Sequence, residues 1–173
     1  MALHDLGGDG PPLLLTHATG FCGAVWRPIA ERLADDFHCW APDLRGHGEA
    51  ETPEGLDYRW RGFADDVLAV VDHLRSAEGA IGDAPLVAAG HSKGGAALLL
   101  AEQRRPGTFA GLYCFEPVVF PGEPIDPDDT GSSGSGGGNH LAQGALRRRA
   151  TFASAYEAYA NFSSKPPLDV LHP

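Results

Sequence analysis

The sequence predicts an α/β fold, with a mostly parallel sheet flanked by helices, and three observations support this. Short apolar runs bounded by Gly or Pro alternate with segments whose apolar residues recur at helical spacing. Apolar residues make up 43% and charged residues 21%, as in an ordinary globular protein. The 173 residues are enough for one domain with a core. Because strands and helices alternate, we expect parallel strands with helices on both faces.

The expected elements follow in order along the first 120 residues. Four apolar runs predict strands at 13–16, 37–41, 85–89 and 110–115. A helix is predicted between the first two strands, with Pro28 in its first turn, where proline is tolerated. Trp26, Ile29, Ala30 and Leu33 recur at helical spacing and mark this first helix. A second helix is predicted from another apolar face at helical spacing, which consists of Phe63, Val67, Val70, Val71 and Leu74. A third helix is predicted over 94–103. Residues 43–53 are rich in Gly and charge and predict a loop.

The composition changes after residue 120. We expect a core over 1–120, a flexible linker over 121–140, and a helical segment over 141–173. The linker is first rich in Pro and Asp and then rich in Gly and Ser. In the last segment, Phe152, Tyr156 and Tyr159 are spaced to share one face of a helix.

The charge balance excludes several classes of partner. Thirteen Lys and Arg against twenty-three Asp and Glu give a net charge of −10, which argues against nucleic acid and against an acidic membrane surface. No apolar stretch approaches the roughly 18 residues needed to span a bilayer. The first twelve residues contain no Lys or Arg and therefore lack the basic start of a secretory signal. Cys22, Cys39 and Cys114 form no CxxC pair, so we expect a reduced, cytoplasmic protein without a structural metal.

One motif indicates nucleophilic catalysis. Residues 90–94 read GHSKG and match G-x-S-x-G. The pattern is weak alone, but here it lies directly between a predicted buried strand and a predicted helix. A sharp strand-to-helix turn at this place lifts the hydroxyl of Ser92 clear of the sheet and keeps it near the free N–H groups of the helix. The alternative interpretation is a glycine-rich turn in which Ser92 has no chemical role.

The order of four segments resembles the α/β-hydrolase fold superfamily, in the branch with a cap domain. These segments are residues 13–17 (LLLTH), 43–48 (DLRGHG), 90–94 (GHSKG) and 115–117 (FEP). The resemblance covers about residues 10–120, is specific for the fold and is unspecific for the substrate. It implies that 1–120 is the N-terminal part of such a core, and that 141–173 is a partial helical cap in which the similarity ends.

The resemblance implies roles for residues around the motif. Ser92 would be the nucleophile that attacks a carbonyl carbon to give an acyl-enzyme. The backbone N–H of Lys93 would be one oxyanion-hole donor. The second donor would be the N–H of Thr19 by register, although an offset to Phe21 stays open because the loop at 17–21 departs from the family pattern.

Further residues near the motif have less direct roles. Glu116 would be the triad acid that orients a histidine, or else a strand-end Glu paired with a loop donor. Asp43 and Arg45 would form a pair that braces the backbone near the site, with His17 and His47 also structural. His91 beside the nucleophile would pack against the sheet, and Arg147, Arg148 and Arg149 would form a solvated helix face.

The catalytic base is the missing component, so we expect the chain to lack the C-terminal part of the fold and Glu116 to orient a histidine that this sequence does not encode. Downstream of Glu116 the chain contains only His140 and His172, and neither follows a predicted strand. The sheet would end at the strand that precedes Glu116, which leaves an exposed edge open to self-association and an uncovered apolar face. Three interpretations remain: the N-terminal portion of a longer hydrolase, a degenerate relative that binds without turnover, or a compact hydrolase with an unexpected or partner-derived base.

The resemblance implies hydrolysis of a small ester, lactone or related acyl substrate by a serine nucleophile, without metal or organic cofactor. Two alternatives are a non-catalytic binding or interaction module on the same fold, and an enzyme of the carbon–carbon bond hydrolase or cofactor-free haloperoxidase type. The partner expected is a small acyl molecule.

Overall fold

The computed structural model describes residues 2–76, 79–119, 147, 149, 151–166 and 168–170. The chain forms two compact units, Met1–Gly131 and Ser132–Pro173. Each unit is described by itself. The predicted linker at 121–140 lies outside the described residues, as do His140 and His172.

The first unit is built on a five-stranded sheet with the order β1-β3-β2-β4-β5. The strands are β1 (Leu3–Gly7), β2 (Pro12–Thr16), β3 (His38–Pro42), β4 (Val87–His91) and β5 (Gly111–Phe115). Strand β2 pairs in parallel with β3 and β4, and β4 pairs in parallel with β5. Only β1 is antiparallel, against β3. The expected mostly parallel sheet is confirmed, and the third predicted strand begins two residues later than the sequence indicated.

The edge strand β1 was not expected from the sequence. Its five residues read LHDLG, with only two leucines between polar residues and glycine. The register shifts between Asp5 and Gly7, which marks a β-bulge. The Asp5 carboxylate also lies 2.8 Å from His38 Nε2 on β3. A short, bulged and charged strand gives almost no alternating apolar signal, because its two leucines are separated by His4 and Asp5 and its register shifts at the bulge.

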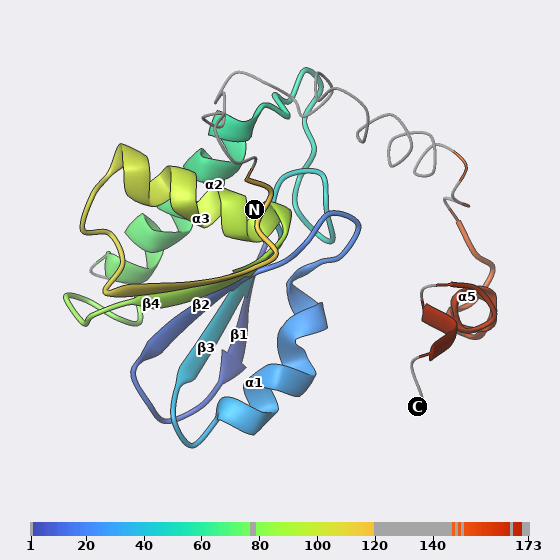
Figure 1. The fold of residues 1–173 in the computed structure, drawn as a ribbon, viewed down its shortest axis with the longest axis horizontal. Coiled ribbons are helices and arrows are strands. Elements are labelled where there is room, and N and C mark those ends of the chain that lie inside the picture. Colours follow the sequence, from blue (N-terminus) through green and yellow to red (C-terminus); the bar gives the residue numbers. More distant parts are fainter. Residues whose placement is uncertain are drawn as a thin grey trace. The chain divides into compact units, whose positions relative to one another are not determined.

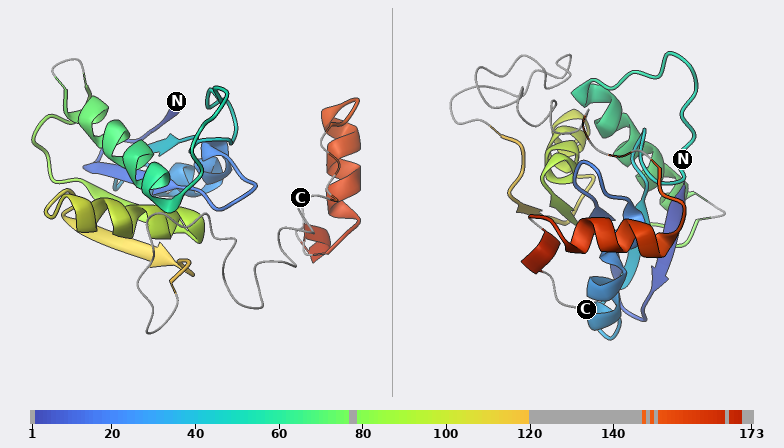
Figure 2. Two further views of the ribbon diagram at one scale, coloured as in Figure 1. Left: turned by 90° about the horizontal axis from the view of Figure 1, so that it is seen from above. Right: turned by 90° about the vertical axis from the view of Figure 1, so that its right-hand side faces the viewer.

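The helices lie on both faces of the sheet. A 3₁₀ turn, η1 (Gly23–Trp26), continues into α1 (Arg27–Leu33), and the longer helices are α2 (Trp60–Arg75) and α3 (Lys93–Arg104). Helices α2 and α3 lie together on one face, and α1 lies on the other (Figures 1 and 2). Pro28 stands at the start of α1, where no backbone hydrogen bond is lost.

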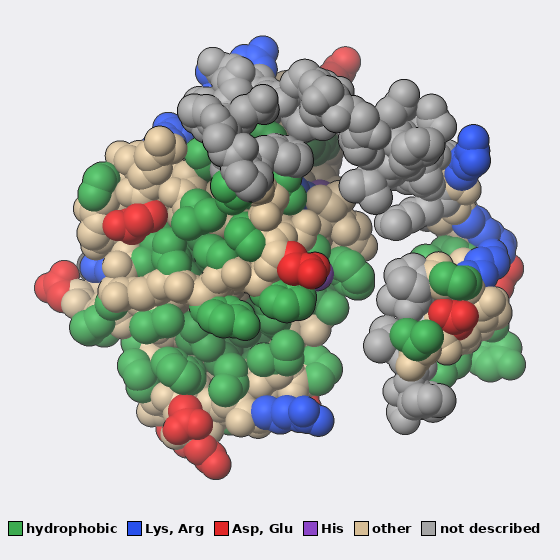
Figure 3. Space-filling model, viewed as in Figure 1, with side chains coloured by type: hydrophobic (Ala, Val, Ile, Leu, Met, Phe, Trp, Pro, Cys, Tyr) green, Lys and Arg blue, Asp and Glu red, His purple; other side chains and the backbone are tan. Residues whose placement is uncertain are grey.

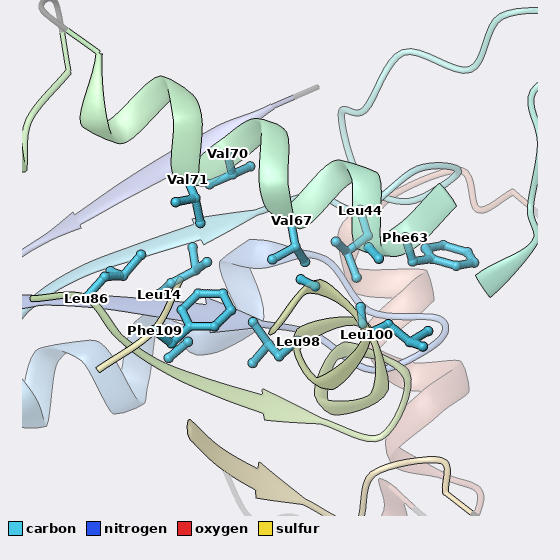
Figure 4. Close-up of a cluster of buried hydrophobic side chains, with 14 of the residues drawn as sticks. Leu14, Leu44, Phe63, Val67, Val70, Val71, Leu86, Leu98, Leu100 and Phe109 are labelled. Carbon is cyan, nitrogen blue, oxygen red and sulfur yellow. The ribbon is translucent and has the colours of Figure 1, made fainter. Parts of the chain in front are cut away.

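The main core lies between the sheet and the pair α2 and α3. The apolar face of α2 meets Leu98 and Leu100 of α3 over Leu14 of β2 (Figure 4). Many of these side chains are fully buried, and burial of each Leu, Val or Phe side chain stabilises the fold by about 1.5–3 kcal/mol. The cluster contains the following residues: Leu14, Leu44, Phe63, Ala64, Val67, Val70, Val71, Leu74, Leu86, Ala88, Ala97, Leu98, Leu100, Ala101 and Phe109.

The opposite face of the sheet is only partly covered. Its buried cluster is small and consists of Leu13, Leu15, Ala30, Cys39 and Ala41. Beside α1, a groove of about 440 Å³ runs over β2, β4 and β5. Figure 3 shows hydrophobic side chains gathered on this surface of the first unit. The groove is lined by Leu13, Leu15, Trp26, Ile29, Leu33, Ala89, Gly90, His91, Tyr113 and Phe115. In the described part of the chain, one short helix covers this face where two cover the other.

The described part of the second unit contains α5 (Ala155–Ser163) and a 3₁₀ turn, η2 (Leu168–Val170). Ser154 caps α5 by accepting the N–H of Glu157 at 3.1 Å, and Glu157 accepts the N–H of Ala153 at 2.7 Å. Phe152 therefore precedes the helix, and the predicted helical face of Phe152, Tyr156 and Tyr159 is wrong at its first member. None of the helices in the described ranges is long and apolar enough to cross a membrane.

Candidate active site

The turn between β4 and α3 places Ser92 at the carboxyl edge of the sheet. Its backbone has φ 52° and ψ −116°, a conformation that L-residues rarely adopt. The Ser92 N–H donates to the Phe115 carbonyl at 2.9 Å, and the Ser92 carbonyl accepts the N–H of Ala96 at 3.1 Å. These bonds hold the serine between the neighbouring strand and the first turn of α3. Strain maintained in this way is typical of a functional position.

The two glycines of the motif allow the turn to pack against the end of β2. A Cβ at Gly90 would lie 2.6 Å from Thr16 Oγ1, and a Cβ at Gly94 would lie 2.8 Å from the carbonyl oxygen of His17. Both distances are too short for a real side chain. The spacing G-x-S-x-G therefore has a steric cause here, because both glycines face the end of β2 or the residue that follows it.

Glu116 lies beside Ser92 at the same edge of the sheet. Strands β4 and β5 pair His91 with Phe115, so the residues that follow them are neighbours. Glu116 has φ 45°, and it and Ser92 are the two non-glycine residues with positive φ in the described ranges. Its side chain is exposed rather than buried at the strand end, so the expected cost of an unpaired carboxylate does not arise. Exposure leaves the carboxylate free to meet a partner from solvent or from another segment.

The loop after β2 presents the second set of backbone groups. His17 is fully buried, its Nδ1 lies 2.9 Å from the Ala18 carbonyl, and its Nε2 accepts the N–H of Leu44 at 3.0 Å. Burial lowers the pKa of His17 to about 4, so the ring is neutral and fixed in one tautomer. The Phe21 N–H donates to the Ala18 carbonyl at 3.2 Å. That bond occupies the Phe21 N–H, which was the alternative oxyanion-hole donor. It favours the N–H of Thr19, which is exposed on the same loop.

Asp43 and Arg45 both brace the site, but they do not pair with each other. Asp43 is buried and accepts the N–H groups of Gly23 at 2.6 Å and Glu49 at 2.8 Å. Burial would raise the pKa of the Asp43 carboxyl, but these donors and His4, 3.1 Å away, outweigh it and lower the pKa. Since both carboxylate oxygens are occupied in this way, the expected Asp43–Arg45 pair is wrong.

Arg45 instead binds Asp66 on α2. The guanidinium donates to both carboxylate oxygens, at 3.0 Å from Nε and 2.7 Å from Nη2. The Arg45 backbone N–H also donates to Asp66, at 2.9 Å. Gly62, one turn before Asp66, leaves the space that the guanidinium fills. Sequence reasoning missed Asp66, although an aspartate beside Phe63 and Val67 on the apolar face of a helix was the signal that could have identified it.

The Lys93 side chain points into the protein, away from the position expected for substrate. It is 5% exposed, its Nζ lies 2.9 Å from His47 Nε2, and it lies 4.4 Å from the centre of the Phe63 ring. Burial lowers the pKa of Lys93 to about 8, and burial likewise lowers that of His47. His47 Nδ1 in turn lies 2.9 Å from the Arg45 carbonyl. The side chain of Lys93 thus ties the first turn of α3 to the loop 43–48, while its backbone N–H remains at the site.

No described histidine reaches Ser92. The His91 ring lies against Phe115 with 5.3 Å between centres and lines the groove on the α1 side. His17 and His47 are engaged as described above. Within the ranges that the structure describes, the Ser92 hydroxyl has no hydrogen-bond partner, and no cluster of three His, Cys, Asp or Glu side chains could hold a metal.

Comparison with known proteins agrees with this geometry. The profile of the Alpha/beta hydrolase family matches residues 13–172, nearly the whole chain. The chain belongs to the alpha/beta hydrolase family. The match includes the β2 loop, the Ser92 turn and β5, which form the edge described above.

Individual members of the alpha/beta hydrolase family are similar over part of their length. Haloalkane dehalogenase 2 of Mycobacterium tuberculosis is 40% identical over 67 residues, which are 39% of this chain and 23% of the dehalogenase. A thermophilic esterase from Thermogutta terrifontis has a TM-score of 0.59 at 29% identity, covering 71% of this chain and 42% of the esterase. The N-acyl homoserine lactonase AidH has a TM-score of 0.57 at 29% identity, covering 66% and 40%. The chain therefore spans about two fifths of these solved hydrolases.

Proposed function

We propose that the chain carries the nucleophile and oxyanion hole of a serine hydrolase that acts on small esters, lactones or related acyl compounds. The observation that carries the proposal is the strained Ser92 turn, with φ 52° between β4 and α3. Esterases and a lactonase among its structural relatives support the substrate class. The net charge of −10 is consistent with a small-molecule substrate rather than a polyanion.

The reaction follows from the placement of these groups. The Ser92 oxygen attacks the carbonyl carbon, forms a C–O bond and gives its proton to a base. The N–H groups of Lys93 and Thr19 stabilise the negative oxygen of the tetrahedral intermediate. The bond to the leaving group then breaks, the leaving group takes a proton, and water later hydrolyses the acyl-serine. Glu116 would orient the base as its imidazolium forms.

Two histidines follow Glu116 and can be tested as the base, although neither follows a predicted strand. His140 and His172 follow Glu116 in sequence, as the base does in the Ser, acid, His order of the superfamily. Both lie outside the described residues, so each is tested by substitution. The base is the component for which the described part of the chain offers no candidate.

Acylation of Ser92 is the direct test. The 173-residue chain is incubated with p-nitrophenyl acetate, and burst release of p-nitrophenol is followed together with intact mass. We expect one acetyl group per chain, lost in Ser92→Ala and retained in Ser76→Ala. Ser76 is a matched control, because its hydroxyl donates to the His73 carbonyl at the end of α2. Equal labelling of wild type and Ser92→Ala would refute the nucleophile assignment.

A second series identifies the base. If His140 or His172 acts, its replacement by Ala lowers the acylation rate at pH 7 by at least about 100-fold, the size of a general-base contribution. A non-catalytic binding module is the second candidate, favoured by a Ser92 hydroxyl that has no partner among the described residues and by the exposed Glu116. If acylation is slow and neither histidine substitution changes its rate, the binding-module alternative is favoured.

A further inference from the structure

The Lys93 side chain carries a buried positive charge next to the Ser92 turn. Its Nζ lies 2.9 Å from His47 Nε2 and 4.4 Å from the centre of the Phe63 ring, and neither partner carries a negative charge. The carboxylate that attracts it is that of Asp66, which already accepts three bonds from Arg45. The described residues therefore leave the ammonium without a counter-ion of its own.

This charge lies close to both proposed oxyanion-hole donors. Lys93 itself provides one N–H, as the first residue of α3. The other, the Thr19 N–H, shares a peptide group with the Ala18 carbonyl, which lies 2.9 Å from His17 Nδ1. The ring of His17 lies 5.1 Å from that of His47, and beyond the effect of burial the charges of His47 and Lys93 lower the pKa of His17. The field of the ammonium thus reaches both sides of the proposed oxyanion hole.

The groups around the ammonium keep their charge state while Lys93 titrates. Burial lowers the pKa of both neighbouring histidines, so both rings are neutral above about pH 7. The surrounding titratable groups are His17 after β2, Arg45 and His47 after β3, and Asp66 on α2, with Asp43 close to the two histidines. A change at alkaline pH that depends on Lys93 therefore reports on its own ammonium.

The charge of Lys93 does not stabilise the fold. Burial lowers the pKa of Lys93 to about 8, which means that the unfolded chain holds this proton more tightly than the folded chain does. An uncharged side chain of similar length, such as methionine, would fill the same space without burying a charge. A buried charge that lowers stability is typical of a functional position rather than of a structural one.

We propose that the buried Lys93 ammonium stabilises, through space, the negative oxygen that forms when Ser92 attacks its substrate. Charges inside a protein interact strongly because their surroundings screen them poorly. The negative oxygen exists in the tetrahedral intermediate and not in the bound ester, so the ammonium favours the reacting state over the ground state. The inference rests on the proposed role of Ser92, and it adds a full charge to an oxyanion hole otherwise made of backbone dipoles.

The pH dependence of acylation tests the proposal with Lys93→Met, which removes the charge and keeps the backbone N–H. With p-nitrophenyl acetate, we expect the variant to be acylated about 10-fold more slowly than wild type at pH 7. The two rates should agree within about 2-fold at about pH 9.5, where wild-type Lys93 is itself neutral. Groups common to both proteins cancel in the ratio of the rates.

Arg32→Met is the matched control, because it removes an exposed positive charge on α1, where solvent screens it. Its acylation rate should equal that of wild type at both pH values. A purely structural role of the Lys93 side chain predicts a ratio between wild type and Lys93→Met that does not change with pH. That result would overturn the proposal.

A second measurement does not depend on acylation. Ser92→Asp places a carboxylate at the turn and Ser92→Asn a neutral side chain of the same shape, and both residues tolerate positive φ. The chain contains two lysines, so NMR with labelled lysine gives two side-chain signals, and the signal lost in Lys93→Met belongs to Lys93. The pKa of Lys93 should be higher in Ser92→Asp than in Ser92→Asn, by about 1.

The NMR result separates this proposal from the proposed function. Equal pKa values of Lys93 in the two Ser92 variants would overturn the electrostatic role, even if wild type is acylated. Unequal values together with no acylation of wild type would contradict Ser92 as the nucleophile, and would still support the action of the Lys93 charge at this position.

Discussion

Lys93 is the proposed oxyanion-hole donor through its backbone N–H, while its side chain lies in the core. A lysine buried without a carboxylate partner within ion-pair distance destabilises the folded state. The hydrogen bond to His47 and the contact with the Phe63 ring offset part of this cost. The lowered pKa of about 8 indicates that the offset is incomplete.

The pKa of Lys93 predicts how stability depends on pH. The folded-state value of about 8 lies below the ordinary value of 10.5, so between these values the unfolded chain binds more protons and stability rises with pH. We expect Lys93→Met to be more stable than wild type at pH 7, by about 1–2 kcal/mol. The difference should shrink by pH 10, as wild-type Lys93 loses its proton in the fold.

Urea unfolding of wild type and Lys93→Met at the two pH values measures this difference, and the groups common to both proteins cancel. Lower stability of the variant at pH 7 would mean that the His47 contact outweighs the burial of the charge.

Ser92 and Glu116 show how backbone strain is placed. Left-handed backbone at a non-glycine residue costs about 1–2 kcal/mol. Ser92 is held by the end of β5 and the residues that follow it, since its N–H donates to the Phe115 carbonyl at 2.9 Å and its carbonyl accepts the N–H of Val118 at 3.4 Å. Their common strain at one edge of the sheet supports a joint role, which exposure of Glu116 alone would not have suggested.

At the scale of elements, the Arg45–Asp66 pair joins the loop after β3 to α2. The two side chains are 15% and 11% exposed, and the Asp66 carboxylate accepts three bonds from Arg45, two from its guanidinium and one from its backbone N–H. Asp66→Asn should therefore destabilise the protein by about 3 kcal/mol, because it leaves a buried guanidinium without its counter-charge.

The neighbouring residue gives a matched control. Asp65 pairs with Arg104 at 2.6 Å, but both side chains are about half exposed, at 51% and 44%. Asp65→Asn should cost less than about 1 kcal/mol, as is usual for surface ion pairs. Chemical denaturation compares the two variants, and equal effects would contradict the assigned role of Asp66.

The helices and parallel strands were predictable because the spacing of apolar residues along the sequence reflects which side chains are buried. The α2 stripe from Phe63 to Leu74 and the buried runs of β2 and β4 follow directly from packing against one core. The strand β1 was missed because its few apolar residues are interrupted by Asp5 and a bulge. The Arg45–Asp66 pair was missed because its partners are 21 residues apart, and only the fold brings them together.

Part of the candidate site could also be located from the sequence. The G-x-S-x-G turn located Ser92 and Lys93 between a strand and a helix, and the family resemblance pointed to Glu116; the pairing of β4 with β5 brings these residues to one edge of the sheet. The direction of the Lys93 side chain could not be predicted, because it follows from contacts with His47 and Phe63, which lie far away in the sequence.

At the scale of the whole first unit, the two faces of the sheet contribute unequally to stability. Leu98 lies in the main core and is fully buried, whereas Ile29 borders the groove and is 46% exposed. Leu98→Ala should cost about 3 kcal/mol from lost burial and the cavity left behind, and Ile29→Ala less than about 1 kcal/mol. Urea unfolding measures both losses of stability as shifts of the midpoint, provided that the slope of the transition is unchanged. A similar loss of stability for each variant would show that the groove side contributes as much to the core as the α2 side.

The bulge in β1 also determines how the sheet ends on that side. Its register shifts between Asp5 and Gly7, and the Asp5 carboxylate is held beside His38 at the same edge. A strand from another molecule could not continue the hydrogen-bond ladder across the bulge and would bury the charge of Asp5. One shifted register thus protects this edge of the sheet against aggregation.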